Sequence, residues 1–402
     1  MSVQRRTLLL YGAALTAGLS VTKAAPASAN ALTSPPPTRL TLPAPTGHLR
    51  LGTTILHLVD PSRPDPWVPT DRVRQLMIQI WYPAAAIDGY SRAPYFTPIT
   101  ARAYENEQSL PVLNWPITDA YLGAPVAPLD GGWPVILYSH DLGGERSETT
   151  SLVEELASRG YVVVTIDHIH DAGVVELPDG RVEVSEVPQL TGAAETAVTT
   201  KDIDSRVADV LFVLDQLAVI NFGGNPDHEH RPLPRGLRGA LDFDRVGMFG
   251  HSDGGSTTAH VLHVDDRVIA GVNLDGTLWT PEAVAGSDHA LLLFGRQDLD
   301  PYEASTWAAF WSNQRGPKLQ LDLLGSTHHT FTDFAPLVPQ IAPLIGMPPS
   351  WIVEEIGTIN GLRAVTVERA YINAWFDMYL RRQNSDLLTG PSASYPEIEF
   401  MS

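Results

Sequence analysis

The chain has 402 residues, of which 44% are hydrophobic and 18% are charged, and its formal net charge at pH 7 is −19. This length and composition predict a globular protein with a large core, and the negative charge argues against partners such as nucleic acid or anionic membranes. Cysteine is absent, which excludes disulfide bonds and a thiol nucleophile.

The N-terminus has the features of an export signal. Arg5-Arg6 precedes an apolar run that is too short to span a bilayer with any margin, and Ala27-Ser28-Ala29 offers a small-residue cleavage pattern. We therefore expect residues 1–29 to be a twin-arginine-type signal peptide of a bacterial, secreted protein. Residues 30–49, rich in Pro, Ala and Thr, are expected to form a flexible tether.

Two apolar segments rich in β-branched residues open the folded part of the chain. Residues 51–59 and 75–81 predict an antiparallel strand pair, because a Pro- and Asp-rich stretch separates them. Residues 83–132 contain many Pro, Tyr and Ala without a clear period. We expect this stretch to make an irregular excursion over the edge of the sheet.

Strands and helices alternate from residue 133 onward. The apolar runs predict strands at 135–138, 161–166, 246–249, 268–272, 290–294 and 319–324, and helices at 150–158, 203–218 and 361–382. Such alternation predicts an α/β fold with a mostly parallel central sheet and helices on both faces, in one domain over residues 50–385. A polar C-terminal tail, 386–402, follows. On the second helix, Arg206 and Asp209 are three residues apart, and we expect an ion pair between them.

A candidate nucleophile lies where one of these strands meets a helix. Gly250-His251-Ser252-Asp253-Gly254 reads G-x-S-x-G, between the apolar run 246–249 and a run of small residues with helical character. A nucleophile elbow needs this context, because the serine occupies a strained turn around which only small residues fit. Ser252 is therefore the predicted nucleophile.

The base and the acid are sought at the carboxyl ends of the later strands. His328 follows the last predicted strand, and we prefer it to His329 because the Gly-x-x-His spacing places it first on the inward side of the loop. Asp275 and Asp298 each end one of two neighbouring strands. Since neighbouring strand ends lie only about 5 Å apart, both aspartates could reach the same imidazole, and the residues alone leave the choice open.

An oxyanion hole needs two backbone N–H groups, one directly after the nucleophile and one from the loop after strand 135–138. Asp253 supplies the first, and Leu142 is the expected donor of the second. Neither a metal nor another cofactor is expected. The cluster His168-Ile169-His170-Asp171 contains ligand-type residues, but we expect it to make hydrogen bonds within its loop.

Together these stretches resemble the plasma-type (group VII) platelet-activating factor acetylhydrolase family of the α/β-hydrolases, over roughly residues 50–385. The resemblance is carried by the segments 56–60 and 78–83, Ser139-His140, Gly250-His251-Ser252-x-Gly254-Gly255, Asn273-Leu274-Asp275-Gly276 and His328-x-x-Phe331-Thr332-Asp333. It implies an α/β-hydrolase fold with Asp275 as the acid and His328 as the base. Asp298 resembles the acid position of cutinase and polyester-hydrolase relatives, and it remains the alternative.

Two residues depart from the family's pattern. Asp141 stands where the family usually has glycine, and Asp253 stands where it has an aromatic or apolar residue. Backbone N–H donation does not depend on either side chain. The added carboxylates would, however, disfavour anionic substrates.

The function expected from this resemblance is that of a secreted serine esterase or lipase, similar to a 1-alkyl-2-acetylglycerophosphocholine esterase, which releases short acyl groups from lipid esters through an acyl-enzyme. The alternative is a cutinase-like polyester or triglyceride hydrolase. A non-catalytic binding protein with this fold is less favoured, because both the serine and the histidine are present. The expected partners are small-molecule or lipid esters, with transient contact at lipid interfaces if the apolar segment 334–351 acts as a lid rather than as a packed crossover.

Overall fold

The computed structural model describes residues 39–68 and 72–401. The predicted signal peptide, 1–29, lies outside the described residues. The predicted tether is described only from residue 39, where Leu40 is buried and Thr46 hydrogen-bonds the carboxylate of Glu155 at 2.6 and 2.7 Å. This part of the tether therefore packs on the domain. Within the described ranges, no helix is long and apolar enough to cross a membrane.

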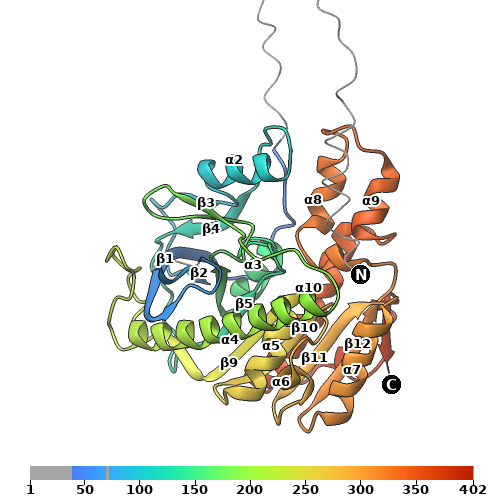
Figure 1. Cartoon of the computed structure of the whole chain (residues 1–402). Coiled ribbons are helices and arrows are strands. Elements are labelled where there is room, and N and C mark those ends of the chain that lie inside the picture. Colours follow the sequence, from blue (N-terminus) through green and yellow to red (C-terminus); the bar gives the residue numbers. More distant parts are fainter. Residues whose placement is uncertain (1–38, 69–71, 402) are drawn as a thin grey trace, which may run out of the picture.

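The described strands form one large mixed sheet and a separate β-ribbon (Figure 1). Six central strands run parallel, in the spatial order β12 (Lys318–Leu323), β11 (Ala290–Arg296), β10 (Val268–Leu274), β9 (Leu241–His251), β5 (Trp133–Ser139) and β6 (Val162–His168). The ribbon pairs β7 (Val174–Glu176) with β8 (Val182–Val184). The prediction of a mostly parallel central sheet is confirmed.

The predicted N-terminal strand pair is also confirmed. β1 (Leu51–Pro64) and β2 (Val73–Pro83) are antiparallel, and β2 joins the parallel strands by pairing antiparallel with β6. Both strands extend beyond their predicted bounds.

The expected irregular excursion over residues 83–132 is wrong in part. This stretch contains β3 (Arg92–Pro94), α2 (Pro98–Glu107) and β4 (Ile117–Leu122), and the two strands extend the sheet beyond β1. Both strands are short, so their apolar residues show no period. The C-terminal tail likewise contains η2 (Asp386–Leu388) and β13 (Ile398–Met401), which pairs antiparallel with β12.

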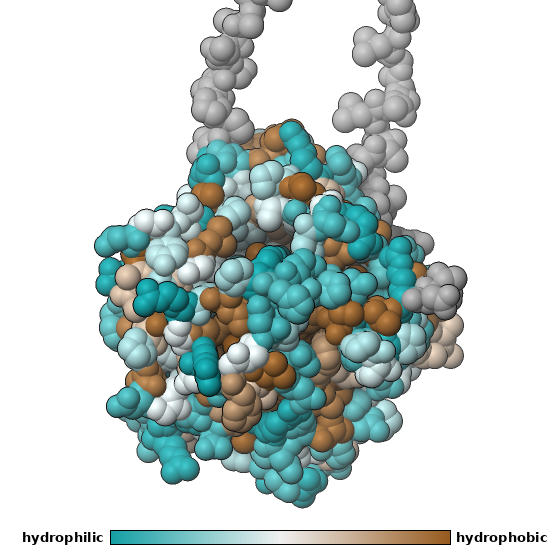
Figure 2. Space-filling view, turned by 90° about the vertical axis from the view of Figure 1, so that its left-hand side faces the viewer, coloured by the Kyte–Doolittle hydropathy of each residue, from teal (hydrophilic) through white to brown (hydrophobic). Residues whose placement is uncertain are grey.

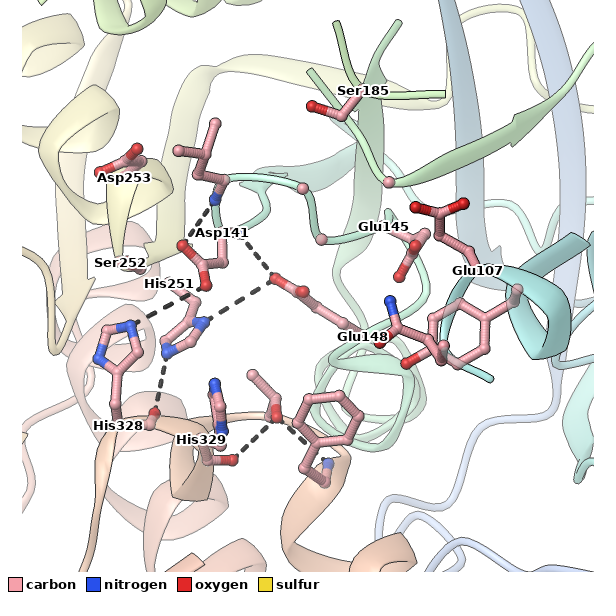
Figure 3. Close-up of a pocket in the computed structure, with 18 of the residues that line it drawn as sticks. Glu107, Asp141, Glu145, Glu148, Ser185, His251, Ser252, Asp253, His328 and His329 are labelled. Atoms are coloured by element: carbon pink, nitrogen blue, oxygen red, sulfur yellow. Dashed lines mark hydrogen bonds and ion pairs between the residues drawn. The ribbon is translucent and has the colours of Figure 1, made fainter. Parts of the chain in front are cut away.

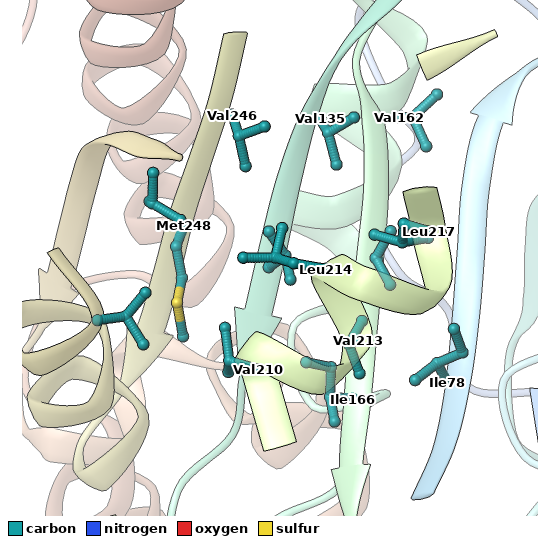
Figure 4. Close-up of a cluster of buried hydrophobic side chains, with 14 of the residues drawn as sticks. Ile78, Val135, Val162, Ile166, Val210, Val213, Leu214, Leu217, Val246 and Met248 are labelled. Atoms are coloured by element: carbon teal, nitrogen blue, oxygen red, sulfur yellow. The ribbon is translucent and has the colours of Figure 1, made fainter. Parts of the chain in front are cut away.

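Helices cover both faces of the sheet, as predicted. On one face, α4 (Ala193–Asn221), α5 (Asp253–Val264), α6 (Pro281–Val284) and α7 (Pro301–Asn313) share a core with the strands. Figure 4 shows Val210, Val213, Leu214 and Leu217 of α4 against side chains of β5, β6 and β9. On the other face, α3 (Thr150–Ser158) and α10 (Gly361–Arg381) pack against the alternate residues of the same strands, such as Ile136 and Tyr138.

A second layer of structure stands above the carboxyl ends of the parallel strands. It comprises α2 on one side and α8 (Phe334–Ile341) with α9 (Pro349–Ile356) on the other (Figure 1). On the face shown in Figure 2, hydrophobic residues form several separate groups between hydrophilic ones.

Candidate active site

The predicted nucleophile occupies a strained turn between β9 and α5. Ser252 has a backbone φ of 55°, and its N–H donates to Leu274 O at 2.9 Å. The flanking glycines are dictated by close backbone approach, because a Cβ atom on Gly250 would overlap the carbonyl group of Gly254, and one on Gly254 would overlap the carbonyl of Ser139. The G-x-S-x-G spacing is therefore a steric requirement of this turn.

Asn273 ties the elbow to the neighbouring turn, a role that the sequence did not reveal. Its Oδ1 accepts from the N–H of Gly276 at 2.8 Å, and its Nδ2 donates to Gly276 O at 2.8 Å. A Cβ on Gly255 would collide with the same Asn273 side chain. The turn that carries Asp275 is thus fixed against the first turn of α5.

The structure brings Asp275 to His328, which begins the short 3₁₀ helix η1 (His328–Phe331). The Nδ1 atom of His328 lies 2.6 Å from Asp275 Oδ2. Asp275 Oδ1 accepts from the backbone N–H of Arg296 at 2.8 Å, and the Arg296 guanidinium contacts Oδ2. Asp298, the alternative acid, is exposed on the loop after β11.

The charges of this pair support one another. Burial lowers the pKa of His328, but the hydrogen bond to Asp275 and its charge outweigh burial and raise the pKa to about 9. Burial raises the pKa of Asp275, yet His328 and Arg296 hold it below its usual value. Asp275 therefore stabilises the imidazolium form of His328, and His328 stabilises the carboxylate form of Asp275.

The loop after β5 carries a side chain into the site. The N–H of Leu142, the expected oxyanion donor, donates to Asp141 Oδ1 at 2.6 Å, and Asp141 Oδ2 lies 4.0 Å from His328 Nε2 (Figure 3). Asp253 begins α5, where the first N–H groups have no carbonyl acceptor within the helix. A substrate carbonyl that used the Leu142 N–H would have to displace the Asp141 carboxylate.

Buried polar groups hold the start of this loop in place. Ser139 Oγ lies 2.9 Å from His168 Nε2, and His168 Nδ1 lies 2.9 Å from Asp209 Oδ2 on α4. All three side chains are fully buried, so substrate cannot reach this second Ser-His-Asp arrangement. Its hydrogen bonds hold the start of the loop in place. His168 makes hydrogen bonds, but its side-chain partners lie on β5 and α4 and not within its own loop as the sequence predicted.

The expected ion pair between Arg206 and Asp209 is wrong. Arg206 pairs with Asp171 at 2.5 Å and with Asp202 at 2.9 Å, and it donates to the carbonyl of His140 in the loop. The i, i+3 rule applies to a solvated helix surface, whereas both residues here are fully buried and have partners on other elements. The position of these charged residues on the apolar face of a helix is the sequence feature by which such a buried network could have been recognised.

A cavity of about 410 Å³ opens beside Ser252 and His328. Much of its wall is aromatic, contributed by Tyr95, Phe96, Tyr104, Trp115, Phe334 and Trp351. Its carboxylates are Glu107, Asp141, Glu145, Glu148, Glu195, Asp253 and Glu355, and no lysine or arginine is among the described residues that line it. Burial raises the pKa of Glu148 to about 8 and that of Asp253 to about 6.

The apolar segment 334–351 forms one wall of this cavity. It contains α8 and the start of α9, which pack on each other through Val338, Ala342 and Trp351, and Leu337 and Ile341 face the cavity. The segment is thus both a packed crossover and part of the cavity lining.

Comparison with known proteins agrees with this architecture. The family model described as "Platelet-activating factor acetylhydrolase, isoform II" matches residues 77–346. The chain belongs to this family. It is 26% identical over 407 residues to a probable 1-alkyl-2-acetylglycerophosphocholine esterase of Arthroderma benhamiae, covering 93% of this chain and 97% of that protein. It is 27% identical over 222 residues to the platelet-activating factor acetylhydrolase of Cavia porcellus, covering 52% and 50% of the two chains.

A solved structure extends the similarity. The ferulic acid esterase from Streptomyces cinnamoneus matches with a TM-score of 0.75 and 35% identity, over 90% of this chain and 99% of that one. This member of the acetylhydrolase family therefore has the α/β-hydrolase fold and is an enzyme that hydrolyses ester bonds.

Proposed function

We propose that this chain hydrolyses carboxylic esters through a triad of Ser252, His328 and Asp275. The observation that carries the proposal is the 2.6 Å contact between His328 Nδ1 and Asp275, because it holds the imidazole at the cavity that Ser252 also lines. A buried carboxylate on Nδ1 fixes the tautomer whose Nε2 can accept a proton.

The reaction then follows from the positions of these groups. His328 Nε2 accepts the proton of Ser252 as Oγ attacks the ester carbonyl, and Asp275 stabilises the imidazolium that forms. The N–H groups of Leu142 and Asp253 hold the negative oxygen once the Asp141 carboxylate has moved aside. His328 returns the proton to the leaving alcohol, and water releases the acyl group from Ser252 by the same steps.

Labelling with an organophosphonate tests the nucleophile. We expect one adduct per chain, on the peptide that contains Ser252, and none in Ser252→Ala, because only an activated serine displaces the leaving group of the reagent at a useful rate. Peptide mass spectrometry measures this. Ser185→Ala is a matched control, since Ser185 lines the same cavity and its loss should leave labelling intact. An adduct on another residue in the wild-type chain would refute the assignment.

The cavity favours neutral esters that carry an aromatic group. Phosphate-bearing acetyl lipid esters are suggested by the names of the curated relatives, and aromatic esters by the name of the structural neighbour, a ferulic acid esterase. The aromatic wall supports the second group. The cavity has no lysine or arginine among its described lining residues to pair with the phosphate of the first, while its carboxylates would attract only the choline end of that head group. We propose that neutral aromatic esters are the preferred class.

A comparison of kcat/KM tests this preference. Methyl ferulate should be turned over at least about tenfold more efficiently than a 1-alkyl-2-acetylglycerophosphocholine, a ratio that corresponds to about 1.4 kcal/mol. A tributyrin emulsion, included in the same assay, tests the alternative of a cutinase-like triglyceride hydrolase. Equal or better turnover of the phosphate ester would contradict the proposed class.

A further inference from the structure

Three side chains from separate segments converge at the rim of the cavity. Asp141 comes from the loop after β5, His251 directly precedes Ser252, and His328 begins η1. One ligand atom from each lies within 4.8 Å of the other two. Figure 3 shows the three side chains turned toward one another, with Glu148 beside them.

His251 contributes an atom whose environment points to a ligand. Its Nε2 lies 2.9 Å from the backbone carbonyl of His328, which only accepts, so Nε2 carries the hydrogen and Nδ1 keeps a lone pair. Among the described residues, the buried Nδ1 has no hydrogen-bond partner, and the Glu148 carboxyl faces it at 4.0 Å. A buried lone pair beside carboxyl oxygens is costly unless a donor or a cation lies between them.

The donor set matches a transition-metal site. Two imidazole nitrogens and one carboxylate oxygen, with a further position open, are the ligands of many zinc sites in which water or substrate completes the tetrahedron. Ligand atoms of tetrahedral zinc lie about 3.3 Å apart, given bonds of about 2.0–2.1 Å. His328 Nε2 and Asp141 Oδ2 lie 4.0 Å apart, so a small rotation of each side chain would suffice.

We propose that Asp141, His251 and His328 bind a divalent transition-metal ion, preferably Zn²⁺, and that this ion reversibly inhibits the enzyme. Bound metal occupies the Nε2 lone pair of His328, which then cannot accept the proton of Ser252. The inhibition rests on the proposed triad, whereas binding of the ion does not. The other carboxylates of the cavity raise the local concentration of cations.

Equilibrium dialysis of Zn²⁺ against the full chain tests the site, with Ser252→Ala used so that binding is measured apart from turnover. We expect one Zn²⁺ per chain at micromolar free concentration. Asp141→Asn should weaken binding at least about tenfold, because the amide oxygen still accepts from Leu142 but is a much poorer ligand. His251→Gln is a second variant, and its amide can still donate to the His328 carbonyl. Asp253→Asn is the matched control, because it removes a carboxylate from the same cavity outside the trio.

The results separate the two proposals. Absence of saturable Zn²⁺ binding by Ser252→Ala, or binding that both Asp141→Asn and His251→Gln leave unchanged, would overturn the metal site. Equal losses of Zn²⁺ affinity in Asp253→Asn and Asp141→Asn would also overturn it, since they would indicate only a general attraction of cations by the negative charge of the cavity. In the wild-type enzyme, Zn²⁺ should abolish ester hydrolysis and EDTA should restore it. Zn²⁺ binding without any ester hydrolysis would refute the proposed function and leave the site standing.

Discussion

Asp275→Asn is expected to lower kcat/KM by about 10⁴-fold, whereas Asp298→Asn should leave it within about threefold of wild type. Asp275 Oδ2 receives the Nδ1 hydrogen of His328 at 2.6 Å, and an amide nitrogen facing that ring would favour the wrong tautomer. Asp298 is exposed, so its charge is screened by solvent. The two variants differ only in which strand end loses its carboxylate. Steady-state kinetics on p-nitrophenyl acetate would measure both.

The pH profile shows whether Asp275 acts through the histidine. The wild-type base is neutral only above a pKa of about 9, so kcat/KM should rise with pH up to that value. Without the carboxylate, the imidazolium loses its largest stabilising partner and its pKa falls. The rise of the residual activity should then move to lower pH. A loss of rate in Asp275→Asn with an unchanged pH profile would indicate a structural effect instead. A large loss of kcat/KM in Asp298→Asn alone would make Asp298 the acid of the triad.

The ambiguity between these two aspartates shows what spacing can and cannot predict. Strand ends follow from apolar runs, so the sequence predicts the edge of the sheet at which both candidates lie. Which carboxylate turns toward His328 depends on the backbone, and Asp275 has a φ of 52° that bends the chain back after β10. Apart from the structure, only the family resemblance distinguishes the two.

The loop after β5 shows a similar limit. The position of Leu142 after a strand predicts that it lies beside the site, because backbone N–H groups follow the path of the chain. Capture of that N–H by the Asp141 carboxylate depends on a side-chain rotamer and on the Glu148 carboxylate, which accepts from the Asp141 N–H at 2.9 Å. No sequence pattern encodes such a contact.

Elements at the edges were the hardest to predict. Most residues of the parallel strands at the centre are buried, and β5, β6, β10 and β11 read as apolar runs. β3, β4 and β13 are only 3, 6 and 4 residues long and gain their pairing from the neighbouring strand, so they carry little signal of their own. The prediction for the helix face with Arg206 and Asp209 failed for another reason, since local pairing rules do not anticipate partners that arrive from distant segments.

Asp209→Ala is expected to lower the free energy of unfolding by about 3–5 kcal/mol. Asp209 accepts from Arg74 at 2.6 Å, from Arg63 at 2.9 Å and from His168 at 2.9 Å, and Arg74 is itself buried. Burial raises the pKa of Asp209, but Arg74 and His168 outweigh it and hold the pKa below its usual value. Removal of the carboxylate leaves a buried guanidinium with only Asp65 as an acidic partner among the described residues. Urea unfolding followed by circular dichroism measures the loss.

Asp215→Ala provides the matched control on the same helix. Asp215 pairs with Arg267 at 2.7 Å, but its side chain is 64% exposed, so the same substitution should cost at most about 1 kcal/mol. If the two variants unfolded at the same urea concentration, the buried network would contribute no more than a surface ion pair. A selective loss in Asp209→Ala should also lower kcat, because His168 would lose the partner through which it holds Ser139 at the start of the oxyanion loop.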